Sequence, residues 1–435
     1  MDYSYYNFLI LKEDKMVMYN VATDGIVLLN SEIANLVEEH QKDVSKIQLI
    51  HPDLYTALVN KGMIVENAAD EWNNLINKWK TEDNDSSTFY LTIYPTMNCN
   101  LHCWYCYEEH KPHTNMKPIL LDRVYKFINS KVRNQQINNL FLSFFGGEPL
   151  LEFNNVVLPI MKYSRDVCAE NDVNLYIDIT TNGVLLSENV RNQILSLDLK
   201  NNPVFQITID GNKEEHNKIR NTTSGFDTYD CIIKNIKGTL SSGMIVNNRF
   251  NYTRESVDSF IDVLDVYADI TEKEKKLLYF DFQQVWQESS FKNIRDKAID
   301  LALLYSRKSL QVRVEKRYNK ERCRDDAENQ ATINYNGLVY KCTARQFKSD
   351  NNEGKLTEDG QIIWNDKYFK RMSIKYGNSF CRSCKIYPIC HGGCSQTKLE
   401  ADTIQGCLFG YSEKEKYDIV DGRLNYILRT KRTSY

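Results

Sequence analysis

Apolar residues between positions 88 and 306 follow two periods that replace each other along the chain. Short apolar runs rich in β-branched and aromatic residues predict six strands, which are Phe89–Tyr94, Leu140–Phe145, Leu175–Thr180, Val204–Ile209, Met244–Phe250 and Leu277–Val285. Stretches with helical spacing follow them, at Lys117–Val132, Asn155–Ala169, Ser187–Leu195, Thr228–Leu240, Ser256–Tyr267 and Lys292–Ser306. Repeated strand–helix units predict a parallel sheet.

The number of these units narrows the fold class. Six strand–helix units are fewer than the eight of a closed barrel, so we expect an α/β fold with an open, partial (β/α)6 barrel. In parallel α/β folds, the loops at the carboxyl ends of the strands build the active site. We therefore expect the chemistry in the loops that follow the predicted strands.

Different patterns precede and follow this central region. Residues 1–75 predict a small α+β module, in which Ser31 caps the first helix. Its strands are expected at Tyr6–Ile10, Met16–Tyr19 and Met63–Glu66, and its helices at Ser31–His40 and Pro52–Lys61. The polar residues 76–87 are the predicted linker, residues 88–314 the barrel, and residues 315–435 a third domain in which the strand–helix alternation ceases.

Composition and charge exclude several classes of protein. The 435 residues carry a net charge of -3 at pH 7, so no strongly basic surface indicates nucleic acid as a partner. No apolar run approaches the ~18 residues of a membrane span, and the N-terminus lacks a secretion signal. We therefore expect a soluble cytoplasmic protein with no membrane partner, whose 12 cysteines are not disulfides.

Three cysteines follow the first predicted strand with the spacing C-x3-C-x2-C, and they are Cys99, Cys103 and Cys106. Three thiolates this close cannot all pair as disulfides, but they can hold a four-iron cluster. One iron of that cluster then has no protein ligand, and this open position is a place for chemistry. A zinc site or three unrelated core thiols is the alternative interpretation.

Seven more cysteines gather in the third region, and they are Cys323, Cys342, Cys381, Cys384, Cys390, Cys394 and Cys407. Four of them form the run C-x2-C-x5-C-x3-C, which taken alone also suits zinc. The two remaining cysteines, Cys168 and Cys231, lie singly in helical patterns and are predicted to be small buried residues.

The cysteine run and the residues after the next strands resemble the radical S-adenosylmethionine (SAM) enzymes. The second strand is followed by Gly146-Gly147-Glu148-Pro149, which is similar to the glycine-rich motif of that superfamily. The other matching segments are Thr181-Asn182-Gly183, Thr208-Ile209-Asp210-Gly211, His216, Arg220, Arg249 and Asn251. The resemblance covers residues 88–410 and rests on these motifs standing in the family's order.

The resemblance implies a reaction and a set of SAM-binding residues. The open iron chelates the amino and carboxylate groups of SAM, and reductive cleavage gives a 5′-deoxyadenosyl radical that abstracts hydrogen from carbon. Glycines allow the backbone to approach the SAM amino group, a glutamate can accept from it, and an arginine can bind the carboxylate. The implied residues are Tyr105, Gly146, Gly147, Glu148, Asn182, Thr208 and Arg220. The alternatives are an ordinary turn for the glycines and a solvated helix position for Arg220, while Asp210 can cap a turn.

The later cysteines resemble the SPASM extension, which binds two auxiliary 4Fe–4S clusters and brings the expected total to three. The resemblance assigns Cys323, Cys342 and Cys394 to the first auxiliary cluster. It assigns the other four, Cys381, Cys384, Cys390 and Cys407, to the second. Some members carry a further cysteine soon after the position of Cys323, which this chain lacks. The fourth position of the first cluster is then open, or filled by another group such as a carboxylate or a substrate thiolate.

Residues 1–75 resemble the PqqD-like modules, which have a winged-helix-like arrangement and bind a leader peptide as an added strand. An unrelated cap on the barrel is the alternative. Because of the resemblance to a leader-binding module, we hypothesise a maturase that cross-links a ribosomally made precursor peptide through a thioether or a carbon–carbon bond. The expected partners are that peptide and an electron donor such as flavodoxin or ferredoxin.

Two other functions compete with this hypothesis. Anaerobic sulfatase-maturating enzymes share the SPASM cysteines, but an aspartate that acts as a base usually follows the position of Cys342, where this chain has Thr343. A non-catalytic zinc- and peptide-binding protein is the alternative of another class. The sequence singles out no catalytic acid or base, because the chain has 58 aspartates and glutamates and no substrate to place beside them.

Overall fold

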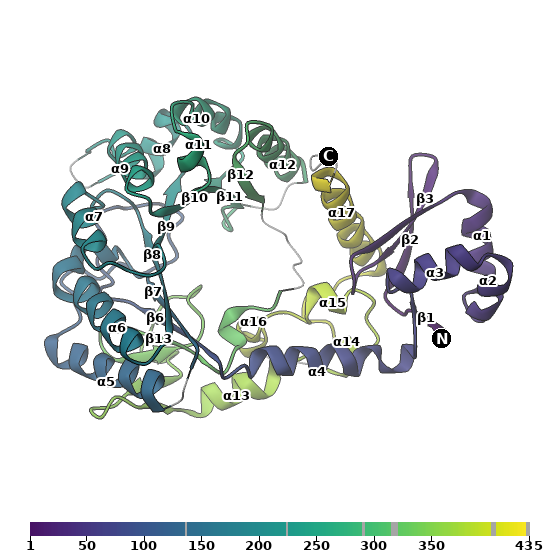
Figure 1. Ribbon diagram of the computed structural model, residues 1–435, viewed down its shortest axis with the longest axis horizontal. Coiled ribbons are helices and arrows are strands. Elements are labelled where there is room, and N and C mark those ends of the chain that lie inside the picture. Colours follow the sequence, from purple (N-terminus) through teal and green to yellow (C-terminus); the bar gives the residue numbers. More distant parts are fainter. Residues whose placement is uncertain (135–136, 223–224, 289–291, 315–320, 402–405, 432–435) are drawn as a thin grey trace. The chain divides into compact units, whose positions relative to one another are not determined.

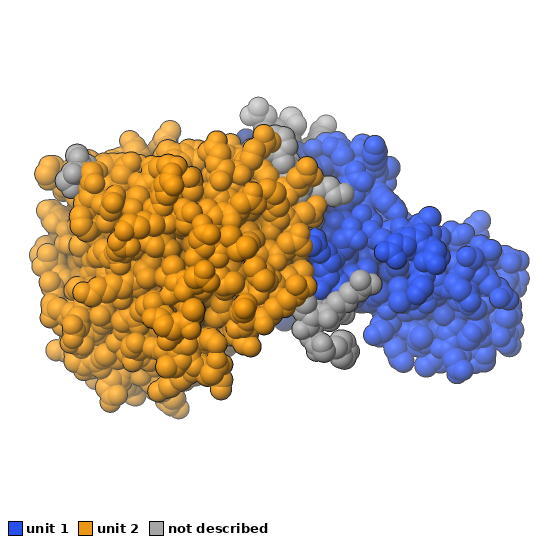
Figure 2. Space-filling view, turned by 90° about the horizontal axis from the view of Figure 1, so that it is seen from above, with its two compact units in different colours: residues 1–84, 316–327, 370–435 blue, residues 85–315, 328–369 orange. Residues whose placement is uncertain are grey.

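A computed structural model describes the chain except residues 135–136, 223–224, 289–291, 315–320, 402–405 and 432–435. The chain divides into two compact units, coloured separately in Figure 2. Unit 1 contains residues 1–84, 316–327 and 370–435, and unit 2 contains residues 85–315 and 328–369. The predicted start of the third domain, at residue 315, lies outside the described residues. No helix in the described part of the chain is long and apolar enough to span a membrane.

A mixed sheet forms the centre of unit 2, and its strand order is β12-β11-β10-β9-β8-β7-β6-β13-β14-β15-β16. All six predicted strands are present, with ends that differ by at most two residues. They are β6 (Thr88–Ile93), β7 (Asn139–Phe144), β8 (Asn174–Thr181), β9 (Val204–Ile209), β10 (Ile245–Tyr252) and β11 (Leu278–Gln284). Each pairs in parallel with the next.

Two further parallel strands, β12 (Gln311–Val314) and β13 (Gln330–Ile333), extend this sheet and were not predicted. β12 pairs with β11, and β13 pairs with β6. After β13 the antiparallel strands β14 (Leu338–Tyr340), β15 (Gly354–Leu356) and β16 (Ile362–Trp364) complete the sheet. Residues 328–369 therefore belong to unit 2, although the sequence pattern assigned them to a separate C-terminal domain.

Helices line the outer side of the curved sheet in Figure 1. The predicted helices are present as α5 (Pro118–Asn134), α6 (Leu158–Glu170), α7 (Glu188–Leu195), α9 (Tyr229–Ser241), α10 (Phe260–Val266) and α12 (Lys292–Arg307). They bury one apolar face each, such as Leu120, Val124 and Phe127 of α5. Two short helices were not predicted, α8 (Lys213–Ile219) and α11 (Glu272–Lys275). Cys168 is buried in α6, as predicted.

The N-terminal part of unit 1 is a three-stranded antiparallel sheet with three helices. The strands are β2 (Asn7–Lys12), β3 (Lys15–Asn20) and β4 (Gly25–Leu29), and the helices are α1 (Ser31–His40), α2 (Val44–Ile50) and α3 (Pro52–Asn60). β4 and α2 were not predicted. The prediction that Ser31 caps α1 is wrong, because the Asn30 side chain accepts from the Ile33 backbone N–H (2.8 Å). A short pair, β1 (Asp2–Tyr3) with β5 (Ile64–Val65), closes the module.

The sheet of this module has a core on both faces. Residues such as Met18 and Leu29 pack with the helices α1 to α3. Ile10, Val17 and Tyr19 pack instead with residues of the cysteine-rich segment and of α17 (Glu413–Lys431). The helix α4 (Glu71–Asp83) runs through the predicted boundary at residue 75. The N-terminal module and the C-terminal segment therefore fold around a shared core.

Candidate cofactor and cluster sites

The first cysteine run lies in the loop that follows β6, at the carboxyl end of the parallel strands. The Cys106 backbone N–H donates to the carbonyl of Cys103 (3.0 Å), and the Leu101 N–H donates to Cys99 Sγ (3.4 Å). Burial raises the pKa of the Cys99 thiol to about 12 and that of Cys103 to about 11. Ionisation of these thiols at neutral pH therefore needs a cation at the sulfurs, which is what a metal cluster supplies.

The glycine motif after β7 packs directly against this cysteine loop. The Gly147 and Glu148 backbone N–H groups donate to the carbonyls of Thr96 (3.1 Å) and Asn98 (2.8 Å). A Cβ at Gly147 would lie 2.1 Å from the Asn98 carbonyl oxygen, which no side chain can do. The close approach of the two backbone segments therefore requires a glycine at position 147, independently of any role in SAM binding.

Glu148 is completely buried and joins the ends of β7 and β8. Its Oε1 accepts from the Thr181 hydroxyl (2.7 Å) and its Oε2 from the Asn182 backbone N–H (2.7 Å). The Asn182 side chain in turn donates to Asn100 Oδ1 (2.7 Å), within the cysteine loop. Glu148 and Asn182, both predicted to bind the cofactor, therefore also hold the loop that carries the cysteines.

A buried polar network surrounds the hydroxyl of Tyr105, the residue between the second and third cysteines. The hydroxyl donates to Asp210 Oδ1 (2.6 Å) and accepts from Arg220 Nη2 (2.9 Å) and Asn251 Nδ2 (3.1 Å). Arg220 also forms an ion pair with Asp210. Asp210 is completely buried and Arg220 is 7% exposed, which excludes the alternative interpretation of Arg220 as a solvated helix residue.

His216 contacts this network through the backbone of Asp210. Its Nδ1 accepts from the Asp210 backbone N–H (3.4 Å), and its Nε2 lies 3.2 Å from Thr228 Oγ1, which donates to the Arg220 carbonyl. Burial, together with the Arg220 charge, holds the pKa of His216 well below its usual range. The imidazole is neutral and connects Asp210, which follows β9, with Thr228, which precedes α9. Thr208, on β9, is also buried and precedes Asp210 by two residues.

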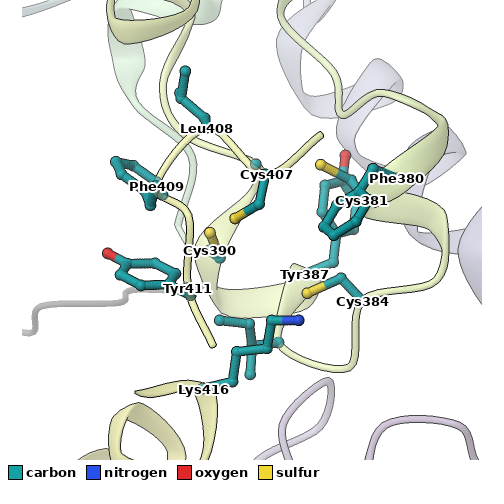
Figure 3. Close-up of a pocket in the computed structure, with 12 residues that line it drawn as sticks. Phe380, Cys381, Cys384, Tyr387, Cys390, Cys407, Leu408, Phe409, Tyr411 and Lys416 are labelled. Atoms are coloured by element: carbon teal, nitrogen blue, oxygen red, sulfur yellow. The ribbon is translucent and has the colours of Figure 1, made fainter. Parts of the chain in front are cut away.

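Four cysteines of the C-terminal segment face one another around a pocket of unit 1 (Figure 3), and they are Cys381, Cys384, Cys390 and Cys407. The helices α14 (Ser379–Arg382) and α15 (Tyr387–Cys390) carry Cys381 and Cys390, and Cys384 lies between the two helices. Asn378 connects them to the fourth, because its Oδ1 accepts from the Cys381 N–H (3.0 Å) and its Nδ2 donates to the Gly406 carbonyl (2.9 Å). The donor set, four thiols around one space, fits a cluster with four protein ligands.

The three cysteines predicted to hold the first auxiliary cluster do not lie in one unit. Cys323 and Cys394 belong to unit 1, whereas Cys342 follows β14 in unit 2. Their joint coordination of a cluster therefore stays a prediction, as does the open or carboxylate-filled fourth position. Among the described residues, no group of three or more His, Cys, Asp or Glu side chains is arranged around a single metal ion. A four-iron cluster is wider than one ion and spreads its thiolates further apart.

Sequence reasoning missed one buried carboxylate, Glu108, which is 7% exposed and follows the cysteine run by two residues. Its Oε1 accepts from the Tyr94 hydroxyl (3.1 Å), and that hydroxyl lies 3.4 Å from the Thr343 carbonyl oxygen. Burial raises the pKa of Glu108 to about 8. Its position beside the cysteines was the available signal, since acidic side chains are rarely buried without a reason.

Three cysteines and a glycine motif meet at the carboxyl ends of the parallel strands, which is the arrangement that the resemblance to radical SAM enzymes predicts. The profile of the radical SAM superfamily matches residues 93–266, which include both. This match covers the central part of the chain, and with the relatives below it makes the protein a radical SAM enzyme, whose cofactors are SAM and a 4Fe–4S cluster. Within that superfamily it is related to the SPASM-type enzymes.

Relatives and solved structures agree with this assignment. The cysteine-type anaerobic sulfatase-maturating enzyme of Clostridium perfringens (strain ATCC 13124) is 23% identical over 371 residues, which are 77% of this chain and 96% of the relative. The radical SAM cyclopropyl synthase TigE of Paramaledivibacter caminithermalis is 23% identical over 388 residues, 79% of this chain and 76% of TigE.

Two solved structures share the fold at low sequence identity. Streptococcus suis SuiB is 18% identical with a TM-score of 0.53, over 93% of this chain and 98% of SuiB. The structure of anSMEcpe with bound AdoMet and the Cp18Cys peptide is 19% identical with a TM-score of 0.57, over 79% of this chain and 99% of that one. The likeness to SuiB therefore extends over most of both units, including the N-terminal module.

Proposed function

We propose that this radical SAM enzyme modifies a ribosomally made precursor peptide by removing a hydrogen atom and joining two of its residues through a thioether or a carbon–carbon bond. The observation that best supports this proposal lies in unit 1, where a small sheet and a four-cysteine pocket share one hydrophobic core. That construction suits an enzyme that holds a peptide and moves electrons in the same body. SuiB, whose fold this chain shares, has been crystallised with its precursor peptide SuiA.

The residues at the carboxyl ends of the strands hold the cofactors in this proposal. Cys99, Cys103 and Cys106 would hold the cluster, which would supply the electron for the reductive cleavage of SAM and so the chemistry that removes a hydrogen atom from the substrate. Arg220 binds the SAM carboxylate. Its guanidinium has five N–H donors, and the contacts to Asp210 and Tyr105 fix its plane without using them all.

Glu148 and Asn182 hold the cysteine loop while the glycine backbone faces SAM. An ionised carboxylate has about four acceptor sites, and Glu148 uses three of them for Thr181, Asn182 and Leu150. One acceptor site of Glu148 therefore remains for the SAM ammonium group.

We propose β4 as the edge to which a leader peptide adds a strand. The sheet order β2-β3-β4 leaves β2 and β4 as its edges. On β2 the Asn7 carbonyl accepts from Lys385 Nζ (3.3 Å), so part of that edge is occupied. β4 carries the side chain of Leu28, which is 61% exposed, and an extended peptide beside it gains backbone hydrogen bonds.

Hydrogen exchange tests this edge directly. Binding of the leader should slow amide exchange in residues 25–29 and leave residues 7–12 unchanged. Protection of β2 alone, or of neither strand at saturating leader, contradicts the assignment of β4.

Sulfatase maturation is the second candidate, favoured by the similarity to enzymes of that name. In this chain the position after Cys342 holds Thr343, which cannot act as a carboxylate base. The absence of an acid at that position favours the peptide cross-link.

Co-expression with short peptides encoded beside the gene tests the reaction. A cross-link should remove ~2 Da per modification, since two hydrogen atoms leave and no group is added. The variant Cys103→Ala is the control and should leave the peptide unchanged. Conversion of a cysteine to an aldehyde, which removes sulfur, would instead support the sulfatase-type reaction.

A further inference from the structure

Lys416 occupies a buried position of α17 where its neighbours predict an apolar side chain. Val420 and Leu424 follow it at four-residue spacing, and both are fully buried in the core of unit 1. Residues with this spacing share one face of a helix. Lys416 is only 8% exposed on that face. A lysine is rarely buried without a negative charge nearby that offsets the desolvation of its ammonium group.

Lys416 lines the same pocket as the four cysteines in Figure 3. Its Nζ contacts the Glu413 carboxylate at 2.5 Å, but that carboxylate is 90% exposed and is therefore screened by water. Lys416 lies in the wall of this pocket, and its ammonium group brings a positive charge to the thiols.

We propose that Lys416 raises the reduction potential of the 4Fe–4S cluster held by Cys381, Cys384, Cys390 and Cys407. This inference rests on the proposed function, which assigns a cluster to these cysteines. One-electron reduction adds negative charge to an anionic cluster, so a nearby cation stabilises the reduced form more than the oxidised form. The rings of Phe380, Phe409 and Tyr411 line the same pocket and lower its polarity, which strengthens the effect.

Redox titration of the full-length, iron-loaded enzyme, followed by electron paramagnetic resonance, tests the proposal. Lys416→Met keeps the length of the side chain and removes its charge. The ratio of reduced to oxidised cluster at a fixed solution potential should fall about tenfold, which equals a shift of about 59 mV to lower potential for one electron.

Three further variants separate charge from structural damage. Lys416→Arg keeps the charge and should retain the wild-type potential. Glu413→Gln removes the exposed negative charge beside Lys416 and should move the potential upward. Lys414→Met removes an exposed lysine two residues away on the same helix and should change nothing. A potential that is equal in Lys416→Met and wild type, with full iron content, overturns the role of Lys416.

Cys384→Ala distinguishes this inference from the cluster assignment on which it rests. The resonance signal that disappears in this variant, with a loss of about four irons per chain, identifies the cluster. If no iron is lost, the assignment of the cluster fails. If iron is lost but Lys416→Met leaves that signal's potential unchanged, only the inference about Lys416 fails.

Discussion

At the scale of single residues, the cofactor site depends on contacts that fix a few polar side chains before any ligand binds. Arg220 is buried and would be unstable there without a counter-charge, which Asp210 supplies. Tyr105 shares both partners and connects them to the cysteine loop. In the proposed function, Asp210 is therefore a positioning residue, which would act on SAM through the orientation of Arg220.

The variant Asp210→Asn should weaken SAM binding. The amide keeps the shape of the side chain but removes the charge that orients Arg220, and a loss of about tenfold in affinity, or ~1.4 kcal/mol, is expected. Equilibrium binding of SAM measures it, together with the change that SAM causes in the resonance spectrum of the reduced cluster. Asp265→Asn, at an exposed position of α10, is the control. Unchanged affinity in Asp210→Asn would contradict the role of this ion pair.

Gly147→Ala should displace the cysteine loop. The new Cβ would lie 2.1 Å from the Asn98 carbonyl oxygen, so the backbone next to Cys99 must move. We expect a loss of about four irons per chain, corresponding to the SAM-binding cluster, measured by iron analysis. In Gly422→Ala, nothing lies within 4 Å of the added Cβ, and iron content should be unchanged. Full iron content in Gly147→Ala would contradict the prediction that the added Cβ displaces the cysteine loop.

At the scale of secondary structure elements, α17 contributes residues both to the apolar core under the N-terminal sheet and to the cysteine pocket. Val420 and Leu424 pack under the N-terminal sheet, while Lys416 at the start of the helix lines the cysteine pocket. Arg423 extends the attachment, because its guanidinium pairs with Asp24, at the turn between β3 and β4 (2.8 Å). The helix therefore ties the module that we assign to leader binding to the segment that we assign to an auxiliary cluster.

Leu424→Ala should destabilise unit 1 by ~2–5 kcal/mol, since it removes a completely buried side chain and leaves a cavity. Urea unfolding of the full chain, followed by a probe in unit 1 such as the fluorescence of the buried Trp79, measures the change. Tyr417→Ala, on the same helix and 40% exposed, should have a much smaller effect. Equal unfolding midpoints for the two variants would argue against the shared core.

At the scale of the whole molecule, the chain passes between the two units several times. Unit 1 is assembled from three separate stretches of sequence and unit 2 from two. The N-terminal stretch supplies Ile10, Val17 and Tyr19 to the core that also contains Ile386 and Ile389 of the cysteine-rich segment. Folding of the four-cysteine pocket therefore depends on residues at the other end of the chain.

Deletion of residues 1–84 should for this reason remove more than peptide binding. The cysteine-rich segment would lose most of its apolar partners, and we expect about four irons per chain to be lost with the second auxiliary cluster. The cysteines that we assign to the SAM-binding cluster lie in unit 2, so this cluster should persist, which resonance spectroscopy with and without SAM can show. A truncated enzyme that keeps all of its iron would contradict this dependence.

Much of the chemistry could be predicted from the sequence because it is local. The spacing of Cys99, Cys103 and Cys106 after a strand defines a cluster ligand set within eight residues. The six strands were predictable for the same reason, since each is a continuous apolar run. β13 was not, because its four residues gain their stability only by pairing with β6, more than two hundred residues earlier in the chain.

The sequence by itself determined the class of enzyme and the residues that can hold its clusters, since ligand type, spacing and strand–helix periodicity are properties of short segments. Only the tertiary structure decided which distant residues meet. It paired Tyr105 with Asp210 and Arg220, it showed that Gly147 is required by the backbone of Asn98, and it placed Lys416 beside four cysteines. These contacts follow from packing between segments far apart in the chain, which no local pattern records.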